Sequence, residues 1–77
     1  MPRRKSDPEL TASIAQRIYD ARLVKDMTQM GLAVAMGTTP SVISHWENGR
    51  QIPATEMLAP LCEALEVTPN YLLGWED

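Results

Sequence analysis

The sequence contains no phenylalanine and only four aromatic residues, Tyr19, Trp46, Tyr71 and Trp75. Leu, Ile, Val, Met and Ala side chains must therefore build the apolar core. The 77 residues suffice for one small domain. A core of this size gives only marginal stability unless its packing is efficient or a partner adds buried surface.

Cysteine and histidine are almost absent. Cys62 is the single cysteine, so no internal disulfide can form and nothing suggests an oxidising compartment. His45 is the single histidine, so nothing resembles a metal site, and no cofactor is expected. The sequence also shows no nucleophile–base pair, carboxylate pair or phosphate-binding loop, which argues against an enzyme and against catalytic residues.

Long hydrophobic runs are missing as well. No apolar run approaches the ~20 residues that a helix needs to span a membrane. The N-terminal residues MPRRKSDPE are basic but lack the apolar segment of a secretory signal. We therefore expect a cytoplasmic protein without a membrane partner.

Basic residues are absent from the last third of the chain. All seven lie in residues 1–50, where there are five acidic residues, whereas residues 51–77 hold five acidic residues and neither Lys nor Arg. The formal net charge of −3 would by itself argue against a nucleic-acid partner. The uneven distribution is instead compatible with one basic face on an acidic body.

Residues typical of helix ends divide the sequence into several short predicted helices. Asp7-Pro8 predicts the start of a helix near residues 8–24, because Asp caps a helix N-terminus and Pro suits the first helical position. Within this range apolar residues recur on one face, at spacings of four and three: Leu10, Ile14, Ile18 and Ala21. Residues 1–6 are expected to form a flexible basic arm, and residues 7–77 the folded domain.

Two further helices follow. Thr28 can cap the second, which ends near residue 36 because Gly37 permits a left-handed stop. Thr39-Pro40 repeats the cap-and-proline signal and opens a third helix that runs through residue 47. No segment shows sustained strand alternation, so the expected fold class is all-α.

A fourth and a fifth helix complete the expected fold. Pro53 and Thr55 precede the fourth, whose apolar stripe comprises Met57, Leu58, Leu61, Cys62 and Leu65. Pro60 falls inside this pattern and removes a backbone donor, so the helix either begins late or is kinked there. Thr68-Pro69 starts the short fifth helix over residues 70–73, which Gly74 closes.

The most informative stretch is QMGLAVAMGTTPSVISHWENG, residues 29–49. Two short helices that cross steeply over a tight turn need a small residue at their contact and a residue tolerant of positive φ in the turn. Ala33 and Gly37 meet these two needs. Apolar anchors that hold both helices on the body occupy the expected places: Leu32, Met36, Ile43 and Trp46.

This stretch resembles the lambdoid phage repressor and Cro family of helix-turn-helix proteins, the XRE-type transcriptional regulators. The resemblance covers roughly residues 12–74 and includes Arg22, Thr28-Gln29, Gly37-Thr38-Thr39, Glu47-Asn48-Gly49 and the ending TPNYLLG. It implies a five-helix, lambda-repressor-like DNA-binding domain. In such a domain the second and third helices form the helix-turn-helix, and the third enters the DNA major groove.

The resemblance implies base contacts from the third helix: Pro40, Ser41, Ser44 and His45. Ser41 and His45 are four residues apart and share a helix face. Serine can bond either base type, and an imidazole can address guanine or a phosphate. Pro40 and Ser41 depart from the family pattern, which often places longer hydrogen-bonding side chains there. The alternative is an ordinary solvent-exposed helix surface.

Phosphate contacts are implied for Thr28, Gln29, Thr39, Asn48 and Arg50. Gln29 stands at the start of the second helix, where free N–H groups favour a phosphate, and a Gln at this place in the family bonds the DNA backbone. The family also uses the loop after the third helix on phosphate, and Arg50 is the only basic residue after Lys25. Arg22 and Glu47 match a charged pair of the family, which implies a largely buried ion pair.

The implied function is transcriptional regulation by sequence-specific binding to a double-stranded DNA operator, as in a phage, prophage or bacterial repressor. The alternative is a protein-interaction module or an antitoxin with the same fold, with a toxin or an antirepressor as its partner. Arg3, Arg4 and Lys5 either add phosphate contacts or form a plain solvated terminus.

A homodimer is expected, because a single five-helix domain contacts too few base pairs for a useful specificity ratio. Apolar side chains near the end of the sequence either cap the core or form the seam of this dimer: Tyr71, Leu72, Leu73 and Trp75. Of these, Leu72, Leu73 and Trp75 are the candidate seam. So many apolar residues at an exposed terminus are typical of an interaction surface.

Overall fold

The structure, a computed structural model, describes residues 8–75. Within this range the chain forms five α-helices and no strand: α1 Pro8–Val24, α2 Gln29–Met36, α3 Pro40–Glu47, α4 Thr55–Leu65 and α5 Pro69–Leu73. The all-α, five-helix architecture predicted from the sequence is confirmed. The basic arm expected over residues 1–6 lies outside the described residues.

Threonine side chains start three of these helices. Thr28, Thr39 and Thr68 are N-caps, and each hydroxyl accepts a hydrogen bond from the backbone N–H three residues further on. Each cap satisfies a donor that has no partner within its helix. Pro40 and Pro69 follow directly, at a position where a missing N–H breaks no helical hydrogen bond.

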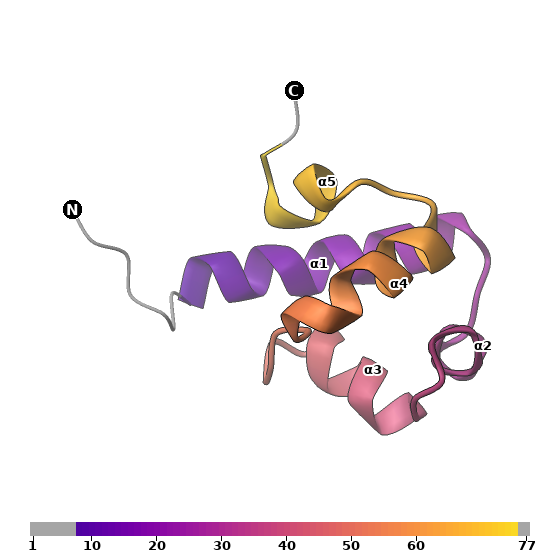
Figure 1. The fold of residues 1–77 in the computed structure, drawn as a ribbon. Helices are drawn as coiled ribbons and strands as arrows, with labels where there is room; N and C mark the ends of the chain where they lie inside the picture. The colour runs from indigo at the N-terminus through magenta and orange to yellow at the C-terminus, as the bar shows by residue number, and fades with distance from the viewer. Residues whose placement is uncertain (1–7, 76–77) are drawn as a thin grey trace.

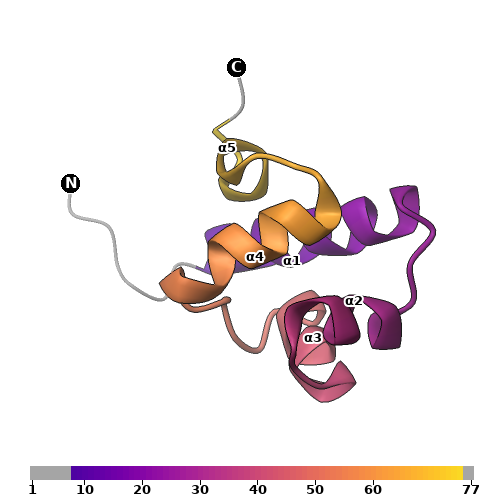
Figure 2. The same cartoon turned by 45° about the vertical axis from the view of Figure 1, so that its right-hand side comes forward.

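Helix α1 is the longest and runs through the middle of the molecule (Figure 1). In that view α2 and α3 lie below α1, α5 lies above it, and α4 crosses in front. After a 45° turn, α2 and α3 remain side by side below α1, and α5 remains above it (Figure 2). The two helices of the expected helix-turn-helix and the C-terminal helix therefore occupy opposite sides of α1.

The core lies where the five helices meet, and every helix contributes a fully buried side chain to it: Ile18, Leu32, Ile43, Leu61, Leu65 and Leu72. Trp46 is also buried, at 3% exposed, and packs as an anchor of α3. Of the two alternatives for Leu72, a place in the core and a place in an exposed dimer seam, the seam is wrong. Because α5 packs on α1, the Leu72 side chain points into the core instead.

Helix α4 begins at Thr55, five residues before Pro60, and continues to Leu65. The alternative in which this helix begins late is therefore wrong. Pro60 removes the N–H that would bond the carbonyl of Glu56, four residues earlier. Both residues are exposed, so water can bind that carbonyl and the helix continues.

We predict a loss of stability at alkaline pH that depends on Cys62. Burial of this side chain in the core raises the pKa of its thiol above the usual 9.0, because the thiolate is poorly solvated there. As pH rises past 9.0, the unfolded chain loses the proton while the folded chain keeps it, so the free energy of unfolding falls. Urea unfolding of the parent and Cys62→Ala between about pH 8 and about pH 10 measures the effect. The stability advantage of the parent should shrink with pH, and a constant difference would contradict the prediction.

Candidate nucleic-acid interface

The turn between α2 and α3 is built on Gly37. Its φ of 72° is left-handed, a conformation that glycine adopts without steric cost. The N–H of Gly37 donates to the carbonyl of Val34 at 3.2 Å, and the N–H of Thr38 donates to that of Ala33 at 2.9 Å. These bonds close the end of α2. Ala33 is fully buried, as a close contact between the two helices requires.

Helix α3 buries one face and exposes another. Ile43 and Trp46 lie in the core. The residues predicted to contact bases are accessible, with Ser41 exposed and the others partly exposed: Pro40, Ser44 and His45. Ser41 and His45 therefore lie one turn apart on a face that the core does not use.

Two of the predicted phosphate-binding residues also cap helices. Thr28 Oγ1 accepts from the N–H of Gly31 at 2.9 Å, and Thr39 Oγ1 accepts from the N–H of Val42 at 3.4 Å. Each hydroxyl uses a lone pair for its cap and keeps its proton for an outside acceptor. A phosphate oxygen can therefore be bound at both helix starts without loss of the caps.

Polar side chains near the end of α3 bond one another. Asn48 Nδ2 donates to Ser44 Oγ at 3.1 Å, which joins a predicted phosphate contact to a predicted base contact. Gln29 Nε2 donates to Glu47 Oε1 at 3.1 Å, a bond that sequence reasoning did not find. Each amide keeps a second N–H, so both can still donate to a ligand.

Arg22 and Glu47 lie together beneath this surface. Arg22 Nε is 2.7 Å from Glu47 Oε2, and its Nη2 is 3.0 Å from Oε1, so the two side chains meet in bidentate geometry. Their side chains are 10% and 5% exposed, respectively. Arg22 Nη1 also donates to the carbonyl of Met27 at 2.9 Å. The hydrogen bond with Glu47 raises the pKa of Arg22 against the opposing effect of burial, so the guanidinium stays charged.

A polar cleft of about 320 Å³ opens beside this ion pair, lined from α1, α2 and the end of α3 by Gln16, Tyr19, Arg22, Gln29, Glu47 and Asn48. Tyr19 is 42% exposed, and the Arg22 guanidinium lies over its ring, 5.4 Å from the centroid. The cleft thus brings two predicted phosphate contacts, Gln29 and Asn48, next to side chains of α1.

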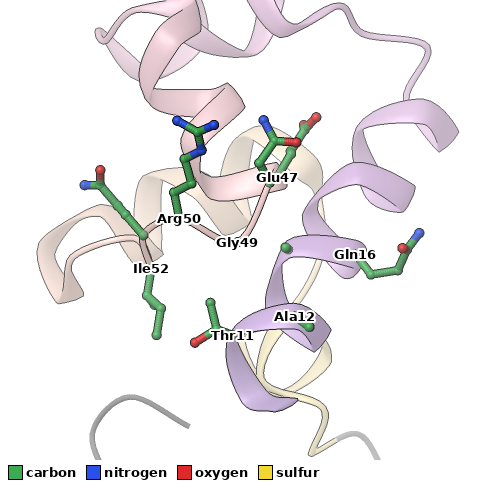
Figure 3. Close-up of a pocket in the computed structure, with 10 residues that line it drawn as sticks. Thr11, Ala12, Gln16, Glu47, Gly49, Arg50 and Ile52 are labelled. Carbon is green, nitrogen blue, oxygen red and sulfur yellow. The ribbon is translucent and has the colours of Figure 1, made fainter. Parts of the chain in front are cut away.

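A larger groove of about 600 Å³ lies between α1 and the loop that follows α3. Figure 3 shows Thr11, Ala12 and Gln16 on the α1 side and Gly49, Arg50 and Ile52 on the loop side. Arg50 is exposed there. Gln16, Glu47 and Asn48 line both the cleft and the larger groove, so the two adjoin. We call them together the α1–α3 groove.

Sequence reasoning missed the α1 side of this groove. Gln16 and Tyr19 are exposed positions on an amphipathic helix, and no motif distinguishes them from ordinary solvated surface. Their spacing of three residues is the one signal in the sequence, and it indicates only that the two side chains share a helix face.

Other kinds of site find no support in residues 8–75. None of the helices there combines the length and apolarity that crossing a membrane requires. The same residues contain no group of three or more His, Cys, Asp or Glu side chains that could hold a metal ion. Their buried side-chain nitrogen and oxygen atoms all have hydrogen-bond partners. The polar groups that remain for a ligand are therefore those of the surface.

The sequence profile of the helix-turn-helix family matches residues 18–72. Vegetative-specific protein H7 of Dictyostelium discoideum is 42% identical over 60 residues, 78% of this chain and 58% of that protein. Multiprotein-bridging factor 1 of Candida albicans is 39% identical over 59 residues, 77% of this chain and 39% of that protein. The 26 kDa repressor protein of Escherichia phage HK022 is 41% identical over 49 residues, which are 64% of this chain and 21% of that protein. The chain therefore spans less than two thirds of the length of each of these relatives.

Solved structures of two regulators have a similar fold. The P22 c2 repressor protein in complex with synthetic operator 9T has a TM-score of 0.77 and 32% identity, over 82% of this chain and 96% of that chain. The restriction-modification controller protein C.AhdI of Aeromonas hydrophila has a TM-score of 0.75 and 26% identity, over 80% of this chain and 94% of that chain. These similarities agree with the lambda-repressor-like fold expected from the sequence.

We predict that Arg22→Met lowers the free energy of unfolding by about 3–5 kcal/mol, because it leaves the Glu47 carboxylate buried without its partner. Urea unfolding measures this loss. The double variant Arg22→Met/Glu47→Met is the control, and it should recover much of the stability because no unpaired charge remains. A single variant as stable as the parent would show that the pair does not hold the fold.

Proposed function

The chain belongs to the helix-turn-helix family of Cro-like and phage-repressor-like DNA-binding regulators, and on that premise we propose that it regulates transcription by binding a double-stranded DNA operator in a sequence-specific manner. The observation that carries this proposal is the exposed face of α3, where Ser41 and His45 have no role in the core. A helix presented in this way suits the major groove. The specific role that we propose is that of a phage, prophage or bacterial repressor in the cytoplasm.

We assign the reading of bases to the exposed face of α3: Pro40, Ser41, Ser44 and His45. The two serine hydroxyls are short and reach base edges directly or through an ordered water. A ring nitrogen of His45 bonds guanine, and Pro40 offers apolar surface to a thymine methyl. Short side chains at the start of α3 allow the helix backbone to approach the bases closely.

Phosphate contacts hold α3 in register. We assign them to two hydroxyl protons, two amides and one guanidinium: Thr28, Thr39, Gln29, Asn48 and Arg50. Of these five side chains only that of Arg50 is cationic, so it is the one among them that is expected to contribute to the salt dependence of binding. In this proposal the arm over residues 1–6 adds phosphate contacts through Arg3, Arg4 and Lys5, and residues 7–77 form the DNA-binding domain.

A second candidate function is protein interaction through α2. This helix contains no charged residue, and its Met30 and Val34, one turn apart, are 58% and 71% exposed. Apolar side chains exposed together suit a protein partner, and several relatives are named multiprotein-bridging factors. Under this alternative the chain is an interaction module or an antitoxin, and its partner is a toxin or an antirepressor.

We also propose that the chain binds its operator as a two-fold homodimer. Two α3 helices on one face would then enter the major groove roughly 34 Å apart, one turn of DNA. Trp75 is 74% exposed and Leu73 is partly buried, so Trp75 is the strongest remaining candidate for the seam. A two-fold contact repeats the same surface on both copies, so one exposed tryptophan contributes twice.

The first functional prediction is that phosphate contacts determine affinity for any duplex, whereas base contacts determine the preference for one sequence. Duplexes are selected from a random pool, and selected and random duplexes are then titrated with each variant at several salt concentrations. Arg50→Ala should weaken binding to both alike and reduce the salt slope by about one unit. Ser41→Ala and His45→Ala should each lose roughly 1–3 kcal/mol on the selected duplex and little on random duplex.

Gln29→Ala is the matched control for Arg50→Ala. It should lower affinity for both duplexes without changing the salt slope, because the amide carries no charge. If Ser41→Ala and His45→Ala both kept the parent's preferred sequence and affinity, α3 would not be the reading element. If the parent failed to bind random duplex at low salt, the protein-interaction function would be favoured instead.

The second functional prediction concerns assembly. Sedimentation should show a dimer of the parent on operator DNA, and Trp75→Ala should shift the equilibrium towards the monomer because it removes exposed apolar surface from the seam. Val34→Ala removes a side chain of similar exposure from α2 and should leave the equilibrium unchanged. A strict monomer, both free and on operator DNA, would refute the dimer.

A further inference from the structure

Asn48, the residue directly after α3, bonds the exposed face of that helix in two ways. Its side-chain Nδ2 donates to Ser44 Oγ at 3.1 Å, and its backbone N–H donates to the carbonyl of Ser44 at 2.9 Å. Asn48 is exposed and Ser44 is partly exposed, so both remain accessible to a ligand. The pair therefore places an amide beside a hydroxyl that is assigned to the reading of bases.

The backbone on both sides of Asn48 is fixed to the last turn of α3. Gly49 has a left-handed φ of 74°, and its N–H donates to the carbonyl of Trp46 at 3.2 Å. The N–H of Arg50 donates to the carbonyl of His45 at 2.9 Å. Asn48 cannot move away from the helix without breaking these bonds, so its amide stays within reach of Ser44.

The bond from Asn48 determines what the Ser44 hydroxyl can offer to a ligand. A serine hydroxyl has one proton and two lone pairs, so a free one can either donate or accept. Ser44 Oγ uses a lone pair for the Asn48 amide, and no acceptor within residues 8–75 takes its proton. The hydroxyl is therefore prepared to donate its proton to a group outside the protein.

We propose that Asn48 is a positioning residue, which holds the Ser44 hydroxyl as a hydrogen-bond donor towards DNA and so restricts the base that Ser44 reads. This inference rests on the proposed DNA-binding function. In the major groove guanine presents N7 and O6 as acceptors and thymine presents O4, whereas cytosine presents only the donor N4–H. Ser44 therefore favours a guanine or thymine edge over a cytosine edge. The second N–H of the Asn48 amide remains for phosphate, so one side chain connects the register of α3 to the choice of base.

A double-mutant cycle on Ser44 and Asn48 tests this role. The parent, Ser44→Ala, Asn48→Ala and the double variant are titrated with four duplexes, which differ only at the base pair where Ser44→Ala changes the preference. Ser44→Ala should lower the ratio of the affinities for the preferred edge and the cytosine edge by about fivefold, as expected for one hydrogen bond. Asn48→Ala should lower this ratio by about twofold or more, because the released hydroxyl can then also accept. The double variant should lower it no further than Ser44→Ala does, since Asn48 acts on the base through Ser44.

Asn48→Asp should reverse the direction of the bond to Ser44. A carboxylate only accepts, so the Ser44 hydroxyl must give its proton to the new carboxylate, and its lone pairs then face the DNA. Relative affinity at the same base pair should shift by about fivefold towards the edges that donate, those of cytosine N4–H and adenine N6–H. The carboxylate also repels phosphates, but this loss applies to all four duplexes and cancels in the ratio.

Gln29→Ala is the matched control. Gln29 also carries an amide assigned to phosphate, but this amide bonds Glu47 rather than a residue assigned to base reading. Its loss should weaken binding to the four duplexes alike and leave the ratio within about twofold of the parent. Thermal unfolding of each variant establishes that it is folded under the binding conditions.

The outcomes separate this inference from the proposed function. If the parent binds duplex with a salt-dependent affinity, but Asn48→Ala and Asn48→Asp weaken binding to all four duplexes equally, Asn48 contacts phosphate only and this inference alone is wrong. A Ser44→Ala variant that changes the preference at no base pair also overturns it, as does a double variant whose loss is the sum of the single losses. If the parent binds no duplex at low salt, the proposed DNA-binding function fails, and the inference fails with it.

Discussion

The arrangement of the candidate DNA-facing surface depends on the ion pair between Arg22 and Glu47. Arg22 comes from α1 and Glu47 is the last residue of α3, while the same guanidinium bonds the carbonyl of Met27 in the turn before α2. One side chain therefore links three segments whose relative positions decide where α3 lies. Because both charges are largely removed from water, neither is well solvated without the other, and loss of one partner alone weakens the link between these segments.

The ion pair also determines what the surface can bind. The Glu47 carboxylate accepts two bonds from Arg22 and one from Gln29, so its charge is neutralised at the wall of the cleft. A bare carboxylate at this place would repel a phosphodiester. The same contact that fixes the packing of α1 against α3 therefore makes the cleft compatible with the DNA backbone, and stability and binding are linked through one residue.

The local parts of the fold were predictable, and the contacts between distant segments were less so. Thr28, Thr39 and Gly37 mark helix ends with signals that depend only on neighbouring residues, and the structure has those ends. The end of α4 was not marked, because Glu66 adopts the left-handed conformation that glycine usually supplies. Spacing could not show that Gln29 bonds Glu47 or that α1 lines a groove, because both depend on how helices pack. The ion pair between Arg22 and Glu47 was predicted from the family resemblance, and the periodicity of the sequence alone does not indicate it.

The packing of α5 on α1 has a consequence for how the protein is made. Helix α1 leaves the ribosome before the other described helices, but Leu72, near the other end of the described residues, is part of the core that α1 helps to form. The nascent chain therefore cannot close its core until α5 has been synthesised, and until then apolar surface of α1 stays open to chaperones and to misfolding. All residues assigned to DNA contact have been translated by Arg50, yet they acquire their final arrangement only when the C-terminal helix covers the far side of α1.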